Sequence, residues 1–187
     1  MIVNWQPEVR LTSRQLEQFC QKNRDLRIEQ TAQGEVIIMP PVYSDTGNTE
    51  LEIGADLMLW SRQAGGKAFG SNAGFTLPDG SMRSPDAAWI CQDRWDALTF
   101  EERHSFAPLC PDFVLELRSS TDRLLRLQEK MLDYLSNGAR LGWLIDPLEK
   151  QAFVYRPGQE VQHLLNPATL SGEPVLAGFT LDLARVW

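Results

Sequence analysis

The chain has 187 residues, of which 43% are hydrophobic and 23% charged, and this composition is typical of one globular domain rather than a disordered chain. No apolar run approaches the roughly 18–20 residues that cross a bilayer, and the N-terminus lacks a secretory pattern, so we expect a cytoplasmic protein without a membrane partner. A formal net charge of −7 opposes non-specific attraction to nucleic acid, and only two histidines are present, which leaves carboxylates for any acid, base or metal chemistry.

The N-terminal segment is predicted to form a helix and a β-hairpin. Residues 12–22 open on a Thr-Ser pair suited to an N-cap and place apolar side chains on one helical face. Residues 26–30 and 35–41 flank Gly34 and end at a proline pair, which is the pattern of a hairpin.

A long helix and several short strands are expected next. Residues 46–64 have a helical pattern that a pair of glycines ends. Residues 67–71, 74–78 and 85–91 are strand candidates separated by turn residues, and residues 92–110 contain two short helical turns. These three strand candidates are expected to be the first strands of the sheet in the core.

The next segment has the order of a strand, a helix and a strand. Residues 111–120 and 141–146 are almost continuously apolar, as in strands buried on both faces. Between them, Thr121 can cap a helix over residues 122–137, which Gly138 ends. This order predicts a right-handed βαβ crossover between parallel strands.

The C-terminal segment alternates polar and apolar residues. Residues 152–157 and 160–165 predict an antiparallel hairpin, and residues 178–187 a final strand. The whole chain is therefore predicted to be one α/β domain with a mixed central sheet flanked by helices. Residues 1–41 form its N-terminal helix and hairpin, and residues 44–187 its core.

Two acids lie inside these apolar strands. Asp86, in a Ser-Pro-Asp segment, and Glu116 both need a cation, a metal or strong hydrogen bonds where they are buried. If their strands are neighbours, both carboxylates can bind Mg²⁺ or Mn²⁺, which polarises a phosphoryl oxygen and lowers the pKa of bound water. Lys130 shares a helical face with Leu127 and Tyr134, and it is our candidate for orienting or activating that water.

Arg118 competes with Lys130 for this role. It lies two residues after Glu116 on the same strand face, where it could bind phosphate or pair with Glu116, but a permanently protonated arginine is a poor base. Residues 118–130 contain four basic and two acidic side chains, a local charge of +2 that offsets the negative charge of the whole chain. A phosphate-containing substrate is therefore compatible with this region.

Three segments carry a resemblance to a known family: GNTELEIGADLMLW, SPDAAWI and PDFVLELRSSTDRLLRLQEKMLDYLSNGARLGWLIDP. They resemble a large bacterial family of restriction-endonuclease domains, formerly a domain of unknown function, within the PD-(D/E)xK restriction-endonuclease-like superfamily. The similarity covers nearly the whole chain. By this resemblance, Asp86, Glu116 and Lys130 form the site, and Glu50 or Glu52 adds an acid from the first core helix. The sequence departs from the E-x-K pattern because Arg118 stands where lysine is usual, so Lys130 would replace it.

The resemblance implies a Mg²⁺-dependent endonuclease that hydrolyses DNA phosphodiester bonds, acting as a homodimer. An alternative is a catalytically inactive nuclease-fold dimer that works as a binding or regulatory protein, which the net charge and Arg118 favour. A second alternative is a hydrolase such as a glycosidase, in which two carboxylates act without metal. Metal dependence distinguishes these readings.

Overall fold

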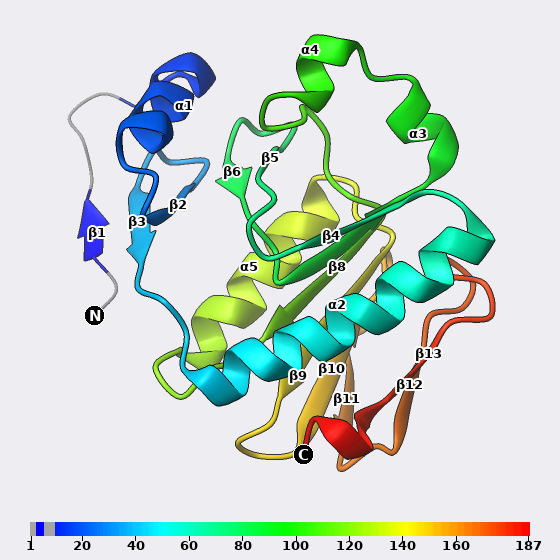
Figure 1. Ribbon diagram of the computed structural model, residues 1–187. Helices are drawn as coiled ribbons and strands as arrows, with labels where there is room; N and C mark the ends of the chain where they lie inside the picture. The colour runs from blue at the N-terminus through cyan, green and yellow to red at the C-terminus, as the bar shows by residue number, and fades with distance from the viewer. Residues whose placement is uncertain (1–2, 6–9) are drawn as a thin grey trace.

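A mixed sheet of six strands forms the centre of the molecule (Figure 1). The computed structural model describes residues 3–5 and 10–187. The strand order is β11-β10-β9-β8-β7-β4, with β8 and β9 parallel and the other neighbours antiparallel. The strands are β4 (Lys67–Gly70), β7 (Ala87–Ile90), β8 (Phe113–Leu117), β9 (Leu141–Asp146), β10 (Gln151–Tyr155) and β11 (Gln162–Leu165). The predicted fold class is confirmed, including the parallel pair on either side of a helix.

The two faces of this sheet bury different side chains. Trp143 and Ile145 of β9 pack in the cluster that includes Ile53 and Leu57 of helix α2 (Ser44–Ala64). Leu144, between them in sequence, packs in the cluster that includes residues of helix α5 (Leu124–Ser136). Because successive side chains in a strand point to opposite faces, a strand covered on both sides must be apolar throughout. This accounts for the almost continuous apolar runs in β8 and β9, in which Glu116 and Asp146 are the acids.

Helix α5 begins later than predicted. The prediction had Thr121 as its cap, but the N-cap residue is Arg123, and its side chain makes no capping hydrogen bond. The reason is the Asp122 carboxylate, which accepts hydrogen bonds from the backbone N–H and the hydroxyl of Ser119 and so forms a turn. The predicted end is confirmed, because Gly138 follows the helix with a φ of +104°.

A second sheet lies beside the first and includes the N-terminal hairpin. Its order is β1-β3-β2-β6-β5, so strands from the N-terminal part and from the core share one sheet. Gln30 of β2 pairs with Met82 of β6, and helix α1 begins after a capping box at Thr12. The elements are β1 (Val3–Trp5), α1 (Ser13–Lys22), β2 (Arg27–Gln30), β3 (Val36–Met39), β5 (Phe75–Thr76) and β6 (Met82–Arg83). This pairing holds β2 against the core.

The remaining elements are short. The final strand β13 (Thr180–Asp182) pairs with β12 (Thr169–Ser171), which the sequence pattern did not predict, and not with the central sheet. The others are α3 (Gln92–Asp96), α4 (Phe100–Arg103) and the 3₁₀ helix η1 (Leu183–Arg185). Among the residues that the structure describes, no helix combines the length and apolar character needed to cross a membrane.

Candidate active site

A cavity of about 280 Å³ opens where β7 begins and β8 ends. The core, the start of α2 and the end of the N-terminal hairpin all contribute to its wall. Its charged lining consists of one cation and four acids: Arg27, Glu50, Asp86, Glu116 and Asp122. The structure thus brings the two acids predicted from sequence into one cavity.

Asp86 lies just before β7 and is 8% exposed. Its Oδ2 accepts a hydrogen bond from the backbone N–H of Leu117 at 2.8 Å, which ties it to the end of the neighbouring strand β8. Its Oδ1 accepts from Nη2 of Arg27 at 2.8 Å. An arginine from the N-terminal hairpin therefore supplies the positive charge that this buried carboxylate requires.

Glu116 lies in β8 and is 2% exposed. Its Oε1 lies 2.8 Å from Nζ of Lys130 and accepts a hydrogen bond from the Tyr134 hydroxyl at 3.0 Å. Burial raises the pKa of Glu116, the positive charge of Lys130 opposes this, and the charges of Asp86 and Glu29 raise it further. A nearby cation would therefore favour the ionised form of Glu116.

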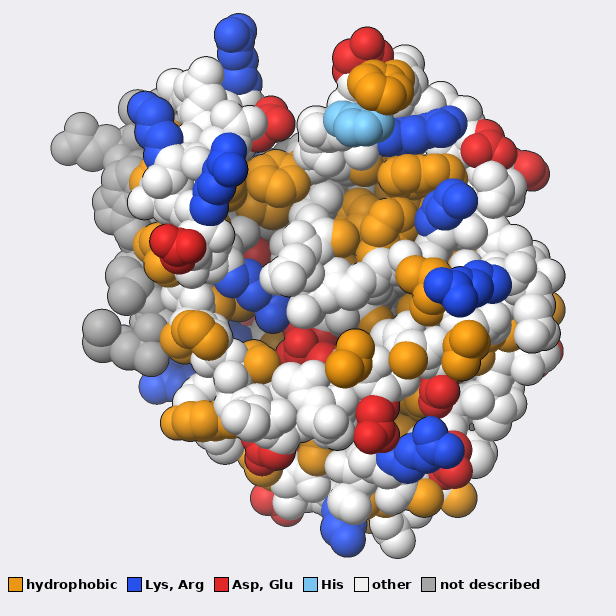
Figure 2. Space-filling view, in the orientation of Figure 1, with side chains coloured by type: hydrophobic (Ala, Val, Ile, Leu, Met, Phe, Trp, Pro, Cys, Tyr) orange, Lys and Arg blue, Asp and Glu red, His pale blue; other side chains and the backbone are white. Residues whose placement is uncertain are grey.

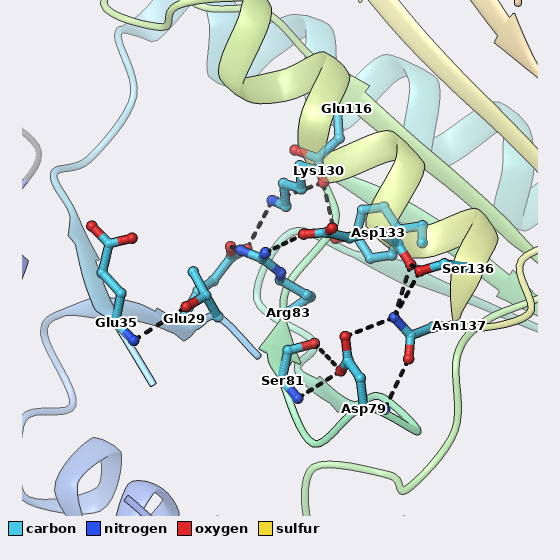
Figure 3. Close-up of polar contacts among 12 residues, drawn as sticks. Glu29, Glu35, Asp79, Ser81, Arg83, Glu116, Lys130, Asp133, Ser136 and Asn137 are labelled. Carbon is cyan, nitrogen blue, oxygen red and sulfur yellow. Dashed lines mark hydrogen bonds and ion pairs between the residues drawn. The ribbon is translucent and has the colours of Figure 1, made fainter. Parts of the chain in front are cut away.

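Lys130 joins Glu116 to Glu29 of strand β2. Its Nζ donates to Oε1 of Glu29 at 2.8 Å, so one ammonium group serves two carboxylates (Figure 3). Burial alone lowers the pKa of Lys130, but the charges of Glu116 and Glu29 outweigh it and raise the pKa. Lys130 is consequently protonated in this arrangement, so it can donate hydrogen bonds and neutralise negative charge but cannot accept a proton.

Arg83 completes the network around Glu29. Its Nη1 lies 3.3 Å from Oε2 of Glu29, and its Nη2 lies 2.7 Å from Oδ2 of Asp133 (Figure 3). The backbone N–H of Ser84 also donates to Oε1 of Glu29 at 2.9 Å. Burial alone raises the pKa of Glu29, but the charges of Lys130 and Arg83 reverse this and lower it to about 2. Glu29 is therefore a fixed negative charge.

Sequence reasoning missed Arg27, Glu29 and Arg83. Arg83 stands directly before the Ser-Pro-Asp segment, and this adjacency is the one signal that could have indicated it. Arg27 and Glu29 lie in a short hairpin strand whose pattern resembles that of any half-exposed strand. Only the docking of β2 on the core brings these two side chains to Asp86 and Lys130.

The ion-paired side chains that connect Asp86, Glu116 and Glu29 carry more negative than positive charge. With every group counted as ionised, four carboxylates face three cationic groups, which leaves 3 − 4 = −1, and Glu50 and Asp122, which line the cavity, make it −3. Carboxylate oxygens are the donors that Mg²⁺ and Mn²⁺ prefer, so the donor chemistry fits a hard divalent cation. Within residues 3–5 and 10–187, however, no three His, Cys, Asp or Glu side chains converge on a position for a metal ion. The acids are Glu29, Asp86, Glu116 and Asp133, and the cations are Arg27, Arg83 and Lys130.

Residues 13–184 match the sequence model of the family Uma2, which is described as "Putative restriction endonuclease". The chain belongs to the Uma2 family. The fold is also similar to a crystal structure described as a putative nuclease belonging to DUF820 from Anabaena variabilis, with a TM-score of 0.75. The two sequences are 24% identical over 94% of this chain and 97% of that chain, and this likeness shows the shared fold. A search of curated proteins finds no match.

Three further residues predicted for the site of this Uma2 protein have separate surroundings. Glu50 lines the cavity, and burial, together with the negative charge of Asp86, raises its pKa. Glu52, the alternative acid predicted on helix α2, is not part of the cavity lining, and its carboxylate accepts a hydrogen bond from Asn48. Arg118 does not pair with Glu116, because its Nη1 lies 2.7 Å from Oδ2 of the fully buried Asp146. Glu50 is therefore the acid that α2 brings to the cavity.

Proposed function

We propose that this Uma2 protein is a metal-dependent endonuclease that hydrolyses DNA phosphodiester bonds. Membership of a family described as restriction endonucleases supports a nuclease. The observation that carries the proposal is the pair of buried carboxylates, Asp86 and Glu116, which line one cavity with a lysine ammonium 2.8 Å from Glu116. Burying an excess of negative charge costs free energy of folding unless a cation compensates it.

In this proposal Asp86 and Glu116 hold Mg²⁺ or Mn²⁺, with Glu50 contributing. Such an ion supplies a Lewis acid for the phosphoryl oxygen and lowers the pKa of a bound water. Side chains of the protein position the water and the metal ligands. Lys130, held between Glu116 and Glu29, orients the attacking water and neutralises negative charge that builds up on the phosphate. Tyr134 fixes the Glu116 carboxylate by its hydrogen bond to Oε1.

Arg27 has a separate part in the proposed site. It neutralises Asp86 while no divalent cation is bound, through the contact between Nη2 and Oδ1. A divalent ion on Asp86 would replace this contact, which frees the guanidinium for a phosphate oxygen of the substrate. We include a homodimer in the proposal, because cutting both strands of a duplex calls for two sites.

A second candidate function is a binding or regulatory protein that keeps the nuclease fold without activity. It is favoured by the protein groups that already hold both oxygens of Asp86, and by the net charge of −7. A hydrolase with a metal-free carboxylate pair, such as a glycosidase, remains the third reading and predicts activity that a chelator does not affect.

Cleavage of end-labelled single- and double-stranded DNA with Mg²⁺ or Mn²⁺ tests the proposal. Wild type is compared with Asp86→Asn, Glu116→Gln and Lys130→Ala, each checked for folding by circular dichroism. We expect metal-dependent cutting that all three substitutions abolish. A folded wild type that binds metal and DNA without cutting would favour the binding protein instead.

A further inference from the structure

A second cavity, of about 510 Å³, lies next to the candidate active site. It is bounded by the end of α1, the start of β2, the connection between β4 and β5, and the residues after α4. Figure 2 shows the molecule hollowed between the lobe that carries α1 and the lobe that carries α4. The side chains that line this second cavity include Glu17, Arg24, Arg27, Asn72, His104 and Phe106.

The charge of this second cavity contrasts with that of the first. The active-site cavity has one arginine and four carboxylates, whereas the second has Arg24 and Arg27 against Glu17 alone. The lining charge is therefore 1 − 4 = −3 in the first cavity and 2 − 1 = +1 in the second. Because Arg27 is already paired with Asp86, Arg24 is the candidate of the second cavity for a phosphate group, which the single carboxylate there repels less than the four of the first cavity do.

The two cavities meet at Arg27, which lines both. Its Nη2 donates to the backbone carbonyl of Ser84 at 2.7 Å and to Oδ1 of Asp86 at 2.8 Å. Ser84 lines the second cavity and Asp86 the first, so one guanidinium stands at the boundary. Nε of Arg27 is buried and has no hydrogen-bond partner among the described residues. Arg27 therefore borders a ligand that extends from one cavity to the other.

The other lining groups suit a nucleotide. Phe106 provides a ring on which a base can stack, and Asn72 provides a hydrogen-bonding side chain, whereas the ring of His104 already stacks on Phe100. A volume of about 510 Å³ is in the size range of small-molecule sites and so suits one nucleotide. A single unpaired strand is the ligand that matches both the charge and the size.

We propose that the second cavity binds one nucleotide of an unpaired substrate strand, next to the bond cut at Asp86 and Glu116. Arg24 contacts a phosphate of this flanking nucleotide, and Arg27 lies between it and the scissile phosphate. This inference rests on the proposed nuclease function. It gives the site a preference for substrates that present a single strand on this side of the cut.

Arg24→Ala is the variant that tests the inference. Arg24 is exposed, and its Nε donates to the carbonyl of Gln21 in the adjoining turn, so its loss leaves the core intact. Arg62→Ala is the matched control, because it removes the same charge from an exposed position in the last turn of α2, outside both cavities and outside the basic segment 118–130. The probe is a fluorescently labelled single-stranded oligodeoxynucleotide, and its dissociation constant is measured by anisotropy on the full chain without divalent metal at several salt concentrations.

We expect Arg24→Ala to weaken binding about five- to tenfold and to lower the slope of log Kd against log salt by about 0.7, with Arg62→Ala within twofold of wild type. If wild type binds and cuts DNA but Arg24→Ala binds as wild type does, the second cavity is not a strand site and the nuclease proposal stands. An equal loss in both variants would also overturn the inference, since it indicates non-specific charge. A wild type that neither binds nor cuts overturns both proposals.

Discussion

Glu29 and Lys130 are 101 residues apart in the chain, yet Oε1 of Glu29 lies 2.8 Å from Nζ of Lys130. Glu29 belongs to the N-terminal hairpin and Lys130 to helix α5. The contact means that the hairpin helps to place a group of the candidate active site. It also gives Glu29 a measurable role in stability and in positioning Lys130.

Glu29→Gln is expected to lower the free energy of unfolding at pH 7 by roughly 1–3 kcal/mol, because Lys130 and Arg83 lose a buried charge partner. The folded pKa of Glu29 is about 2, below its ordinary value of 4.5, so its stabilisation is present above pH 4.5 and is lost as the pH falls toward 2. Urea denaturation of both proteins at pH 7 and pH 3 measures this. An equal difference between the two proteins at both pH values would contradict it.

Glu116 has the opposite pH dependence. Burial and the charges of Asp86 and Glu29, opposed by Lys130, raise its pKa from 4.5 to about 8. Glu116 then binds a proton more readily in the folded protein than in the unfolded chain, so its own contribution to stability is greatest below pH 4.5 and is lost as the pH rises toward 8. We expect Glu116→Gln to raise the metal-free melting temperature at pH 8.5 by several degrees, and to differ less from wild type at pH 5.5. A lower melting temperature for the variant at pH 8.5 would oppose this account.

Arg27 competes with metal for Asp86 in the proposed site. Replacement of Arg27 by Gln removes the cation from Oδ1 of Asp86, so we expect Mn²⁺ to bind about five- to tenfold more tightly. Isothermal titration calorimetry at fixed pH gives the affinity. The same variant should cut DNA more slowly, because it has lost a phosphate ligand. Unchanged Mn²⁺ affinity would show that Arg27 does not limit access to Asp86.

Glu50 and Glu52 form a matched pair for testing the contribution of α2. Glu50 lines the active-site cavity, whereas Glu52 does not, and both lie on the same helix. We expect Glu50→Gln to raise the Mg²⁺ concentration needed for half-maximal cutting about tenfold, and Glu52→Gln to leave it within twofold. The reverse result would mean that Glu52 is the acid contributed by α2.

The sequence predicts the central βαβ unit well, because β8 and β9 are almost continuously apolar, which is the pattern of a strand covered on both faces. For the same reason Glu116, a lone acid in β8, stands out as a candidate. The choice between Glu50 and Glu52 is different. Two residues apart on a helix differ by about 200° in direction, and both faces of α2 carry polar residues, so only the packing of the helix decides.

The contribution of Arg27 and Glu29, from the N-terminal hairpin, to the candidate site could not be predicted from sequence. It depends on the pairing of β2 with β6, for which Gln30 and Met82 are the one pair of partners, and no short pattern encodes such a long-range contact. The ion pair between Arg118 and Asp146 could not be predicted either. Asp146 lies at the end of β9, and it comes next to Arg118 only because β8 and β9 pair in parallel.

The most direct test of the central claim is the nicking of closed circular plasmid DNA, which has no ends for an exonuclease. Wild type and Asp86→Asn are incubated with Mg²⁺ or Mn²⁺ and with a chelator, and the loss of supercoiled plasmid is followed on a gel. The account predicts nicked or linear plasmid with wild type and metal, and intact supercoiled plasmid with chelator or with Asp86→Asn. Equal cutting by Asp86→Asn, or cutting that the chelator leaves unchanged, would contradict a metal site built on Asp86 and Glu116.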